Sequence, residues 1–143
     1  MLCFFHDLSA EDYVRLRSSV GWTPLIREQA QSCLENSDFI VSCRESDETV
    51  GCARVFWDKG YIAYLADVIV IPEYQGQGIG KRLTEAAMEA LSREGIFKTA
   101  LVVFADNDGG NEFWEKLGFT ARTDLVYRNR ENDLSGGTAR EQE

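Results

Sequence analysis

The segment from Ile69 to Leu83 constrains the fold of this chain more than any other. A β-branched run ends at Pro72, three glycines follow within five residues, and an amphipathic helix pattern begins directly after them. Glycine lets the backbone approach a ligand closely, and the first turn of a helix presents N–H groups without intrahelical partners and a partial positive charge. A strand, a glycine turn and a helix in this order therefore predict a binding site for a phosphate or pyrophosphate.

The spacing of the glycines differs from that of the best-known phosphate loops. A dinucleotide-binding fold requires G-x-G-x-x-G, and a P-loop requires G-x-x-x-x-G-K followed by Ser or Thr. Here the order is Q-x-x-G-x-G, from Gln75 through Gly78 to Gly80, which resembles the acetyl-CoA-binding motif of the GCN5-related N-acetyltransferase (GNAT) superfamily. Residues 107–119, N-D-G-G-N-E-F-W-E-K-L-G-F, are similar to a second motif of that family, N-x-x-A-x-x-F-Y-E-K-x-G-F.

The resemblance implies an α+β protein with the acyl-CoA N-acyltransferase (GNAT) fold, a mixed central β-sheet flanked by helices. The residue patterns predict strands and helices in a compatible order. Strands are expected at residues 2–6, 38–44, 50–57, 61–71 and 99–105, a strand pair or a single long strand at 119–128, and helices at 9–20, 23–35, 78–94 and 110–117. Residues 1–128 are predicted to form a single domain, and the polar residues 129–143 a disordered tail.

Three local signals are more specific. Ser9 is expected to cap the first helix, and Thr23 the second, with Pro24 at its first position. Asp58-Lys59-Gly60 is predicted to be a tight hairpin turn in which the glycine takes the positive φ. The strand at 99–105 is expected to lie parallel to the strand at 61–71, because a helix connects them.

Composition excludes several classes of function. The formal net charge of −9 argues against nucleic acid as a partner, and no apolar run approaches the ~20 residues of a membrane span. Four cysteines without C-x-x-C spacing and a single histidine indicate neither a metal site nor a Ser-His or Cys-His triad. The first residues lack the basic region of a signal peptide, so we expect a cytoplasmic location.

The family resemblance implies which residues bind acetyl-CoA, the expected co-substrate. Backbone N–H groups of the glycine turn would contact the pyrophosphate, and the backbone of the strand at 61–71 would pair with the pantetheine arm. The acidic surface suits a cationic amine but repels coenzyme A, which is a polyanion. Cations close to the glycine turn would offset this repulsion. The expected cofactor-binding residues are Val68, Val70, Gln75, Gln77, Gly78, Ile79, Gly80, Lys81, Arg82, Asn107 and Lys116.

Each of these assignments has a structural alternative. Gly80 can serve helix–strand packing alone, and Lys81 can form an i,i+4 pair with Glu85 on a solvated helix face. Val68 can be ordinary core, which is compatible with a role for its backbone. Asn107 can cap a loop.

Catalysis requires that the amine lose a proton, that the developing oxyanion meet a donor and that the thiolate gain a proton. The resemblance makes the Val68 N–H the oxyanion donor. Where the family often carries a glutamate or histidine base, this chain has Tyr64 and Ala66, and a phenol with its ordinary pKa near 10 is a poor base. Asp67, the only carboxylate of this strand, either orients the amine or forms structural hydrogen bonds. Strand alternation places Asp67 on the opposite face from Tyr64 unless a bulge intervenes.

Trp114 departs from the family pattern, because it replaces the tyrosine of F-Y-E-K. An indole N–H can donate a hydrogen bond but does not release its proton at usable pH. Trp114 can still pack beside the thioester, and Tyr64, Tyr61, Tyr127 or solvent would then protonate the thiolate.

We therefore predict an acetyl-CoA-dependent N-acetyltransferase that acts on the primary amine of a small molecule by direct attack on the thioester. The alternatives are a protein or peptide N-acetyltransferase and a catalytically impaired CoA-binding module. The acceptor groove is expected around residues 16–24 and 56–64, whose aromatic side chains indicate an aryl or alkyl amine. Neither a nucleic acid nor a membrane is an expected partner, and no metal is expected. Whether the chain forms a homodimer is left open.

Overall fold

In the computed structural model, which describes residues 1–134, the chain divides into two units, with the boundary between Val102 and Val103. The first unit contains a five-stranded sheet in the order β1-β2-β3-β4-β5. Its strands are β1 (Leu2–Phe5), β2 (Phe39–Glu45), β3 (Glu48–Trp57), β4 (Ile62–Val70) and β5 (Lys98–Ala100). Its helices are α1 (Ala10–Ser19), α2 (Arg27–Glu35), the 3-10 turn η1 (Pro72–Tyr74) and α3 (Ile79–Arg93), and the second unit contains α4 (Asp108–Lys116).

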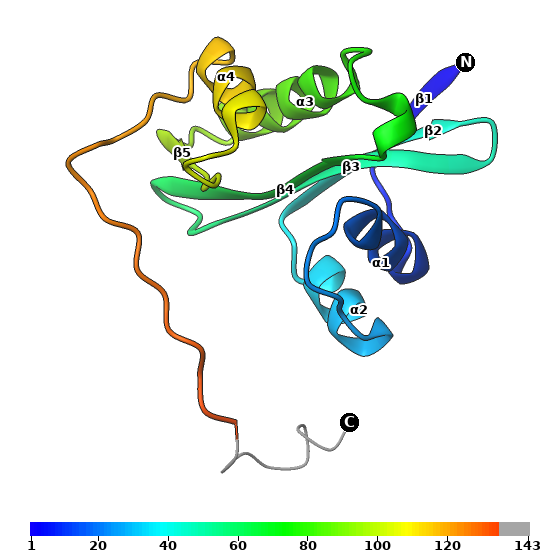
Figure 1. The fold of residues 1–143 in the computed structure, drawn as a ribbon, viewed down its shortest axis with the longest axis horizontal. Helices are drawn as coiled ribbons and strands as arrows, with labels where there is room; N and C mark the ends of the chain where they lie inside the picture. Colours follow the sequence, from blue (N-terminus) through cyan, green and yellow to red (C-terminus); the bar gives the residue numbers. More distant parts are fainter. Residues whose placement is uncertain (135–143) are drawn as a thin grey trace. The chain divides into compact units, whose positions relative to one another are not determined.

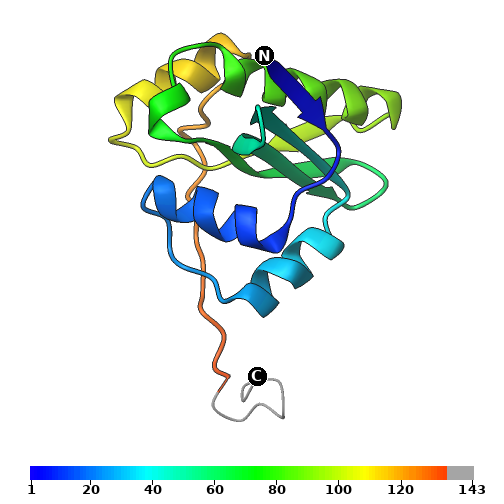
Figure 2. The ribbon, with the colours of Figure 1, turned by 90° about the vertical axis from the view of Figure 1, so that its right-hand side faces the viewer.

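The sheet is mixed, as expected. Strands β1 to β4 pair antiparallel in chain order, and β4 pairs parallel with β5 after the crossover through α3. Figures 1 and 2 show α1 and α2 on one face of the sheet and α3 on the other. The predicted α+β architecture is therefore confirmed.

Close packing fixes α3 against the sheet. Ile79, Leu83 and Leu91 are buried on its inner face. Gly51 of β3 lies under the first turns: a Cβ there would lie 2.9 Å from the Ile69 carbonyl oxygen and 3.2 Å from Leu83 Cδ1. A residue larger than glycine would thus displace the start of the helix from the sheet.

The two N-terminal helices start differently from each other. Ser9 caps α1 as predicted, because its hydroxyl accepts the Asp12 N–H at 3.1 Å. The prediction that Thr23 caps α2 was wrong, since α2 begins at Arg27 after the N-cap Ile26. Arg17 donates two hydrogen bonds to the Thr23 carbonyl, which holds this segment as a link between the helices.

The hairpin turn after β3 forms around an aspartate. The Asp58 carboxylate accepts the N–H groups of Gly60, Tyr61 and Ile62 at 2.7 to 3.1 Å. The residue with positive φ is Lys59, at 68°, rather than the predicted Gly60. Side-chain hydrogen bonding by the aspartate therefore shapes this turn more than glycine does.

The C-terminal strands were over-predicted. Strand β5 is three residues long instead of covering 99–105, and residues 119–128 contain no strand. A strand needs a neighbour to satisfy its backbone, and β5 pairs only with Ile62–Tyr64 before β4 diverges. Residues 129–134 are exposed and without regular structure, whereas 135–143 of the predicted tail lie outside the described residues. The single domain over 1–128 stays a prediction.

Candidate active site

The turn between β4 and α3 has the geometry of an anion-binding loop. Gly76 and Gly78 both take φ of 82°, and the space where a Cβ would lie is open at each. Gln75 donates from Nε2 to the Val70 carbonyl at 2.8 Å, which ties the turn to the end of β4. Gly78 is the N-cap of α3, and within the described chain no side chain caps this helix.

The first turn of α3 therefore presents unpaired N–H groups at the glycine turn. The first intrahelical bond joins the Arg82 N–H to the Gly78 carbonyl at 3.1 Å, so the N–H groups of Ile79, Gly80 and Lys81 precede the helical ladder. Lys81 and Arg82 are exposed beside them. The Arg82 guanidinium lies 4.3 Å from the centre of the Phe4 ring on β1, a contact that holds its charge near the turn. Gln77 is exposed on the same turn.

Strand β4 separates from β5 where the pantetheine arm is expected. The two strands pair only from Ile62–Lys98 to Tyr64–Ala100. Beyond this point, in the described part of the chain, the β4 edge that carries Val68 and Val70 has no strand beside it. This edge can accept an extended ligand as an added strand, which agrees with the backbone roles predicted for these two valines.

A β-bulge at Ala66 sets the orientation of the site residues on β4. Asp67 lies opposite Arg54, but Leu65 lies opposite Val55, so Ala66 is the extra residue. Strand β3 alternates regularly from Arg54 to Phe56, which therefore share a face of the sheet. Phe56 stacks on Tyr64 with ring centroids 5.4 Å apart, and Arg54 pairs with Asp67. The bulge thus brings Tyr64 and Asp67 to the same face of the sheet. Strict alternation along β4 would have placed them on opposite faces.

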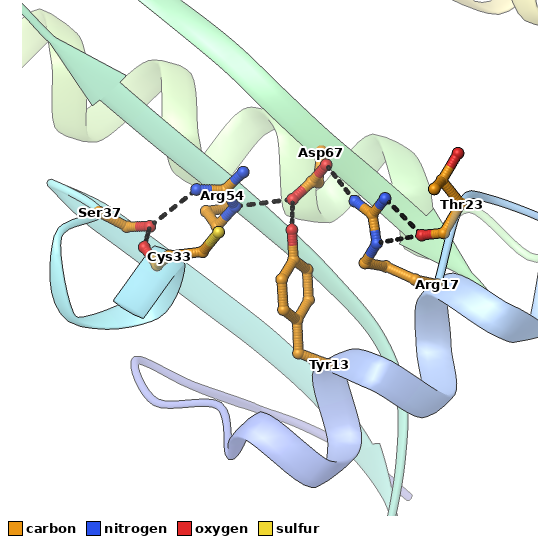
Figure 3. A network of polar contacts seen from close by, with 7 residues as sticks. All are labelled: Tyr13, Arg17, Thr23, Cys33, Ser37, Arg54 and Asp67. Carbon is orange, nitrogen blue, oxygen red and sulfur yellow. Dashed lines mark hydrogen bonds and ion pairs between the residues drawn. The ribbon is translucent and has the colours of Figure 1, made fainter. Parts of the chain in front are cut away.

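Asp67 lies at the centre of a polar network under α1 (Figure 3). Its carboxylate is buried and contacts Tyr13, Arg17 and Arg54, three residues that the sequence did not single out. Burial and the neighbouring carboxylate raise the pKa of Tyr13, which keeps its hydroxyl a donor. Burial opposes the charge of Arg54, but the nearby Asp67 carboxylate outweighs it and raises the Arg54 pKa. This geometry supports the structural alternative for Asp67.

A small hollow of about 250 Å³ adjoins Tyr64 near the start of β4. Its lining is mainly apolar, with one carboxylate at its edge. The residues that line it are Phe56, Trp57, Asp58, Ile62, Ala63, Tyr64 and Ala100. The three backbone N–H groups on Asp58 lower the pKa of that carboxyl below its usual range, so the hollow carries a negative charge at neutral pH.

The remaining predicted site residues belong to the second unit. Asn107 caps α4, since its side-chain oxygen accepts the Gly110 N–H at 2.9 Å. Trp114 packs edge-to-face against Phe119, with centroids 5.3 Å apart. Lys116 pairs with Glu112 at 3.1 Å. These contacts show local roles within the unit. The proposed contributions of Asn107, Trp114 and Lys116 to cofactor binding or catalysis stay predictions.

Comparison with known proteins assigns the fold to a family. The sequence model of the acetyltransferase (GNAT) family matches residues 4–119. The chain belongs to the GNAT family. It is 32% identical over 124 residues to the uncharacterized N-acetyltransferase ycf52 of Pyropia yezoensis, across 84% of this chain and 70% of that protein. It is also 32% identical over 126 residues to the histone acetyltransferase TAP1 of Glycine max, across 80% of this chain and 53% of that protein.

A solved structure of a probable acetyltransferase from meticillin-resistant Staphylococcus aureus has a TM-score of 0.82 with this GNAT protein. The two chains are 27% identical, and the match covers 92% of this chain and 100% of the other. GNAT proteins use acetyl-CoA as the acetyl donor, and this chain is accordingly an N-acetyltransferase. Residues 1–134 contain no group of three or more His, Cys, Asp or Glu side chains arranged to bind a metal ion. Within the same residues, no helix is both long and apolar enough to cross a membrane.

Proposed function

We propose that this GNAT enzyme acetylates the primary amine of a small molecule. The observation that carries the proposal is the continuous backbone surface from the unpaired β4 edge to the uncapped start of α3 at Gly78. The β4 edge offers β-type hydrogen bonds to a pantetheine arm, and the N–H groups at Gly78 and Gly80 suit a pyrophosphate. Both features lie in one unit and are joined by the Gln75 contact to Val70.

The hollow beside Tyr64 supports a small acceptor. Its volume of about 250 Å³ lies just below the usual range for ligand pockets, so it suits a compact amine better than a peptide segment. The apolar walls match an aryl or alkyl group, and the charged Asp58 carboxylate at its edge attracts an ammonium group. The net charge of −9 adds a favourable long-range field for such a cation.

The proposed reaction forms a C–N and an S–H bond and breaks a C–S and an N–H bond. The neutral amine nitrogen attacks the thioester carbonyl carbon and gives up one proton, the C–S bond breaks, and coenzyme A leaves as a thiol after its thiolate receives a proton. The Val68 N–H would donate to the carbonyl oxygen as negative charge develops there. Tyr64, whose ring lies at the hollow, is the side chain we assign to proton transfer near the amine or the sulfur.

We also propose that the reaction takes place in the cytoplasm.

The test measures thiol release from acetyl-CoA by the purified chain with a panel of amines. The panel includes arylalkylamines, aliphatic diamines, a peptide with a free N-terminus and a peptide with an internal lysine. The proposal expects thiol release with a small amine, together with a product that is heavier by one acetyl group. Turnover of only the peptides would assign the chain to the protein N-acetyltransferases. Binding of acetyl-CoA without turnover of any amine would indicate an impaired CoA-binding module.

A further inference from the structure

Asp67 is a buried carboxylate that three side chains hold from two elements (Figure 3). The Tyr13 hydroxyl of α1 donates to its Oδ2 atom, and Arg54 Nε of β3 donates to the same oxygen at 2.7 Å. Arg17 Nη1 of α1 lies 3.9 Å from Oδ1. Asp67 is 4% exposed, so these contacts are shielded from water. Tyr13, Arg17 and Arg54 each present a hydrogen-bond donor to the carboxylate, an arrangement that fixes its position.

The position of Asp67 in the chain connects this network to the reaction site. Asp67 directly follows the bulge residue Ala66 and directly precedes Val68. One planar peptide joins the Asp67 carbonyl to the Val68 N–H, so a rotation of the Asp67 backbone redirects that N–H. The regular ladder is interrupted at a bulge, and side-chain contacts must therefore contribute more to fixing the backbone there.

The same network reaches both ends of α2. Arg17 donates from Nε and Nη2 to the Thr23 carbonyl, at 3.3 and 2.8 Å, in the segment before the helix. Arg54 Nη1 donates to Ser37 Oγ at 3.2 Å just after the helix, and the Ser37 hydroxyl donates to the Cys33 carbonyl at 2.6 Å. The two arginines therefore connect Asp67 to the whole α1–α2 face.

We propose that Asp67 is a positioning residue that directs the Val68 N–H toward the thioester oxygen. Tyr13, Arg17 and Arg54 hold its side chain, and its backbone in turn sets the peptide that carries the N–H. The inference rests on the proposed function, because it requires the acetyl-CoA carbonyl to lie at Val68. It differs from a role as base or as a ligand of the amine, since Tyr13, Arg17 and Arg54 surround the carboxylate, which is only 4% exposed.

The test reads the thioester carbonyl directly and needs no acceptor. Acetyl-CoA labelled with ¹³C at the acetyl carbonyl is bound to the full-length protein, and its C=O stretch is measured by isotope-edited infrared difference spectroscopy. A hydrogen bond from Val68 weakens the C=O bond, so the band of the wild-type complex should lie below that of free acetyl-CoA. In Asp67→Asn, the band should return toward the free position.

Kinetics supply the second readout once an acceptor is known. A donor that is displaced but still present should lower kcat by up to about 10²-fold, the loss that a misplacement of about 1 Å can cause. The KM for acetyl-CoA should change little, because the contact strengthens only in the transition state. A rise in KM with unchanged kcat would overturn the inference.

Two further variants separate positioning from loss of folding. Tyr13→Phe removes one hydroxyl without changing the shape of the side chain, and it should shift the band part of the way toward the free position. It decides the test where Asp67→Asn does not fold. Ser42→Ala removes a buried hydroxyl that donates to the Asp7 carbonyl at 2.7 Å, on β2, and it should leave the band in place. A wild-type band in folded Asp67→Asn, or in Tyr13→Phe when Asp67→Asn does not fold, overturns the inference. Failure of the wild-type protein to bind acetyl-CoA overturns the proposed function itself.

Discussion

Replacing Gly51 by alanine should destabilise the protein and disturb the cofactor site together. The added Cβ would lie 2.9 Å from the backbone oxygen of Ile69 and 3.2 Å from Leu83 Cδ1. The carbonyl belongs to the neighbouring strand β4 and cannot retreat, so α3 has to move. Overpacking of this kind costs about 1 to 3 kcal/mol, and alanine recovers about 0.5 to 1 kcal/mol over glycine in a strand. The midpoints of these two ranges leave a net loss of about 1 kcal/mol, and their upper limits a net loss of about 2 kcal/mol.

This loss should be visible in thermal unfolding. For a chain of this size, 1 kcal/mol corresponds to about 4 °C, so Gly51→Ala should lower Tm by about 4 to 8 °C. The matched control is Gly60→Ala, where the nearest atom is 3.9 Å from the added Cβ and the Tm should stay within about 2 °C. Acetyl-CoA affinity, measured by calorimetry, should fall in Gly51→Ala alone, because Ile79 and Leu83 carry the first turns of α3. Equal Tm values for the two variants would refute the close-packing argument.

The other predictions concern the turn, the proton donor and the hairpin. Gly78→Glu should abolish acetyl-CoA binding in calorimetry, whereas Gly78→Ala, which strains the same left-handed φ of 82° without adding charge, should retain part of it. Trp114→Tyr should raise kcat by up to ~10²-fold if protonation of the thiolate limits turnover. Tyr64→Phe should lower kcat if Tyr64 already supplies that proton. An unchanged kcat in both variants would exclude a general-acid role for either residue. The Asp58 carboxyl, whose pKa is lowered from 3.8 by the N–H groups of its turn, should stabilise the hairpin above pH 4 and lose that effect as pH falls through its folded pKa. An NMR titration midpoint at or above 3.8 would contradict the last expectation.

The glycine turn and the helix after it were predictable because their signals are local. Gly76, Gly78 and the apolar spacing from Ile79 onward lie within a few residues of one another, and each acts through its own backbone conformation. The parallel β4–β5 pair followed from the helical crossover between them. The length of β5 did not, since it depends on where β4 diverges beyond Tyr64 rather than on the apolar run itself.

The network around Asp67 could not be predicted, because its members are distant in the sequence. Tyr13 and Asp67 are separated by 54 positions, and Arg54 lies 13 positions before Asp67. An arginine within the apolar run of β3 was the one local signal that a buried anion lies nearby. No residue pattern in the sequence marks the bulge at Ala66, although the bulge is what places Tyr64 on the same face of the sheet as Asp67.

A crystal structure with acetyl-CoA would show whether the glycine turn and the β4 edge bind the cofactor. We expect the pyrophosphate oxygens to lie about 2.7 to 3.2 Å from the backbone nitrogens of the turn at Gly78, Gly80 and Lys81. We also expect the pantetheine arm to pair with the β4 edge at Val68 and Val70. A pyrophosphate bound away from the start of α3, or an arm that does not contact β4, would contradict this assignment of the site.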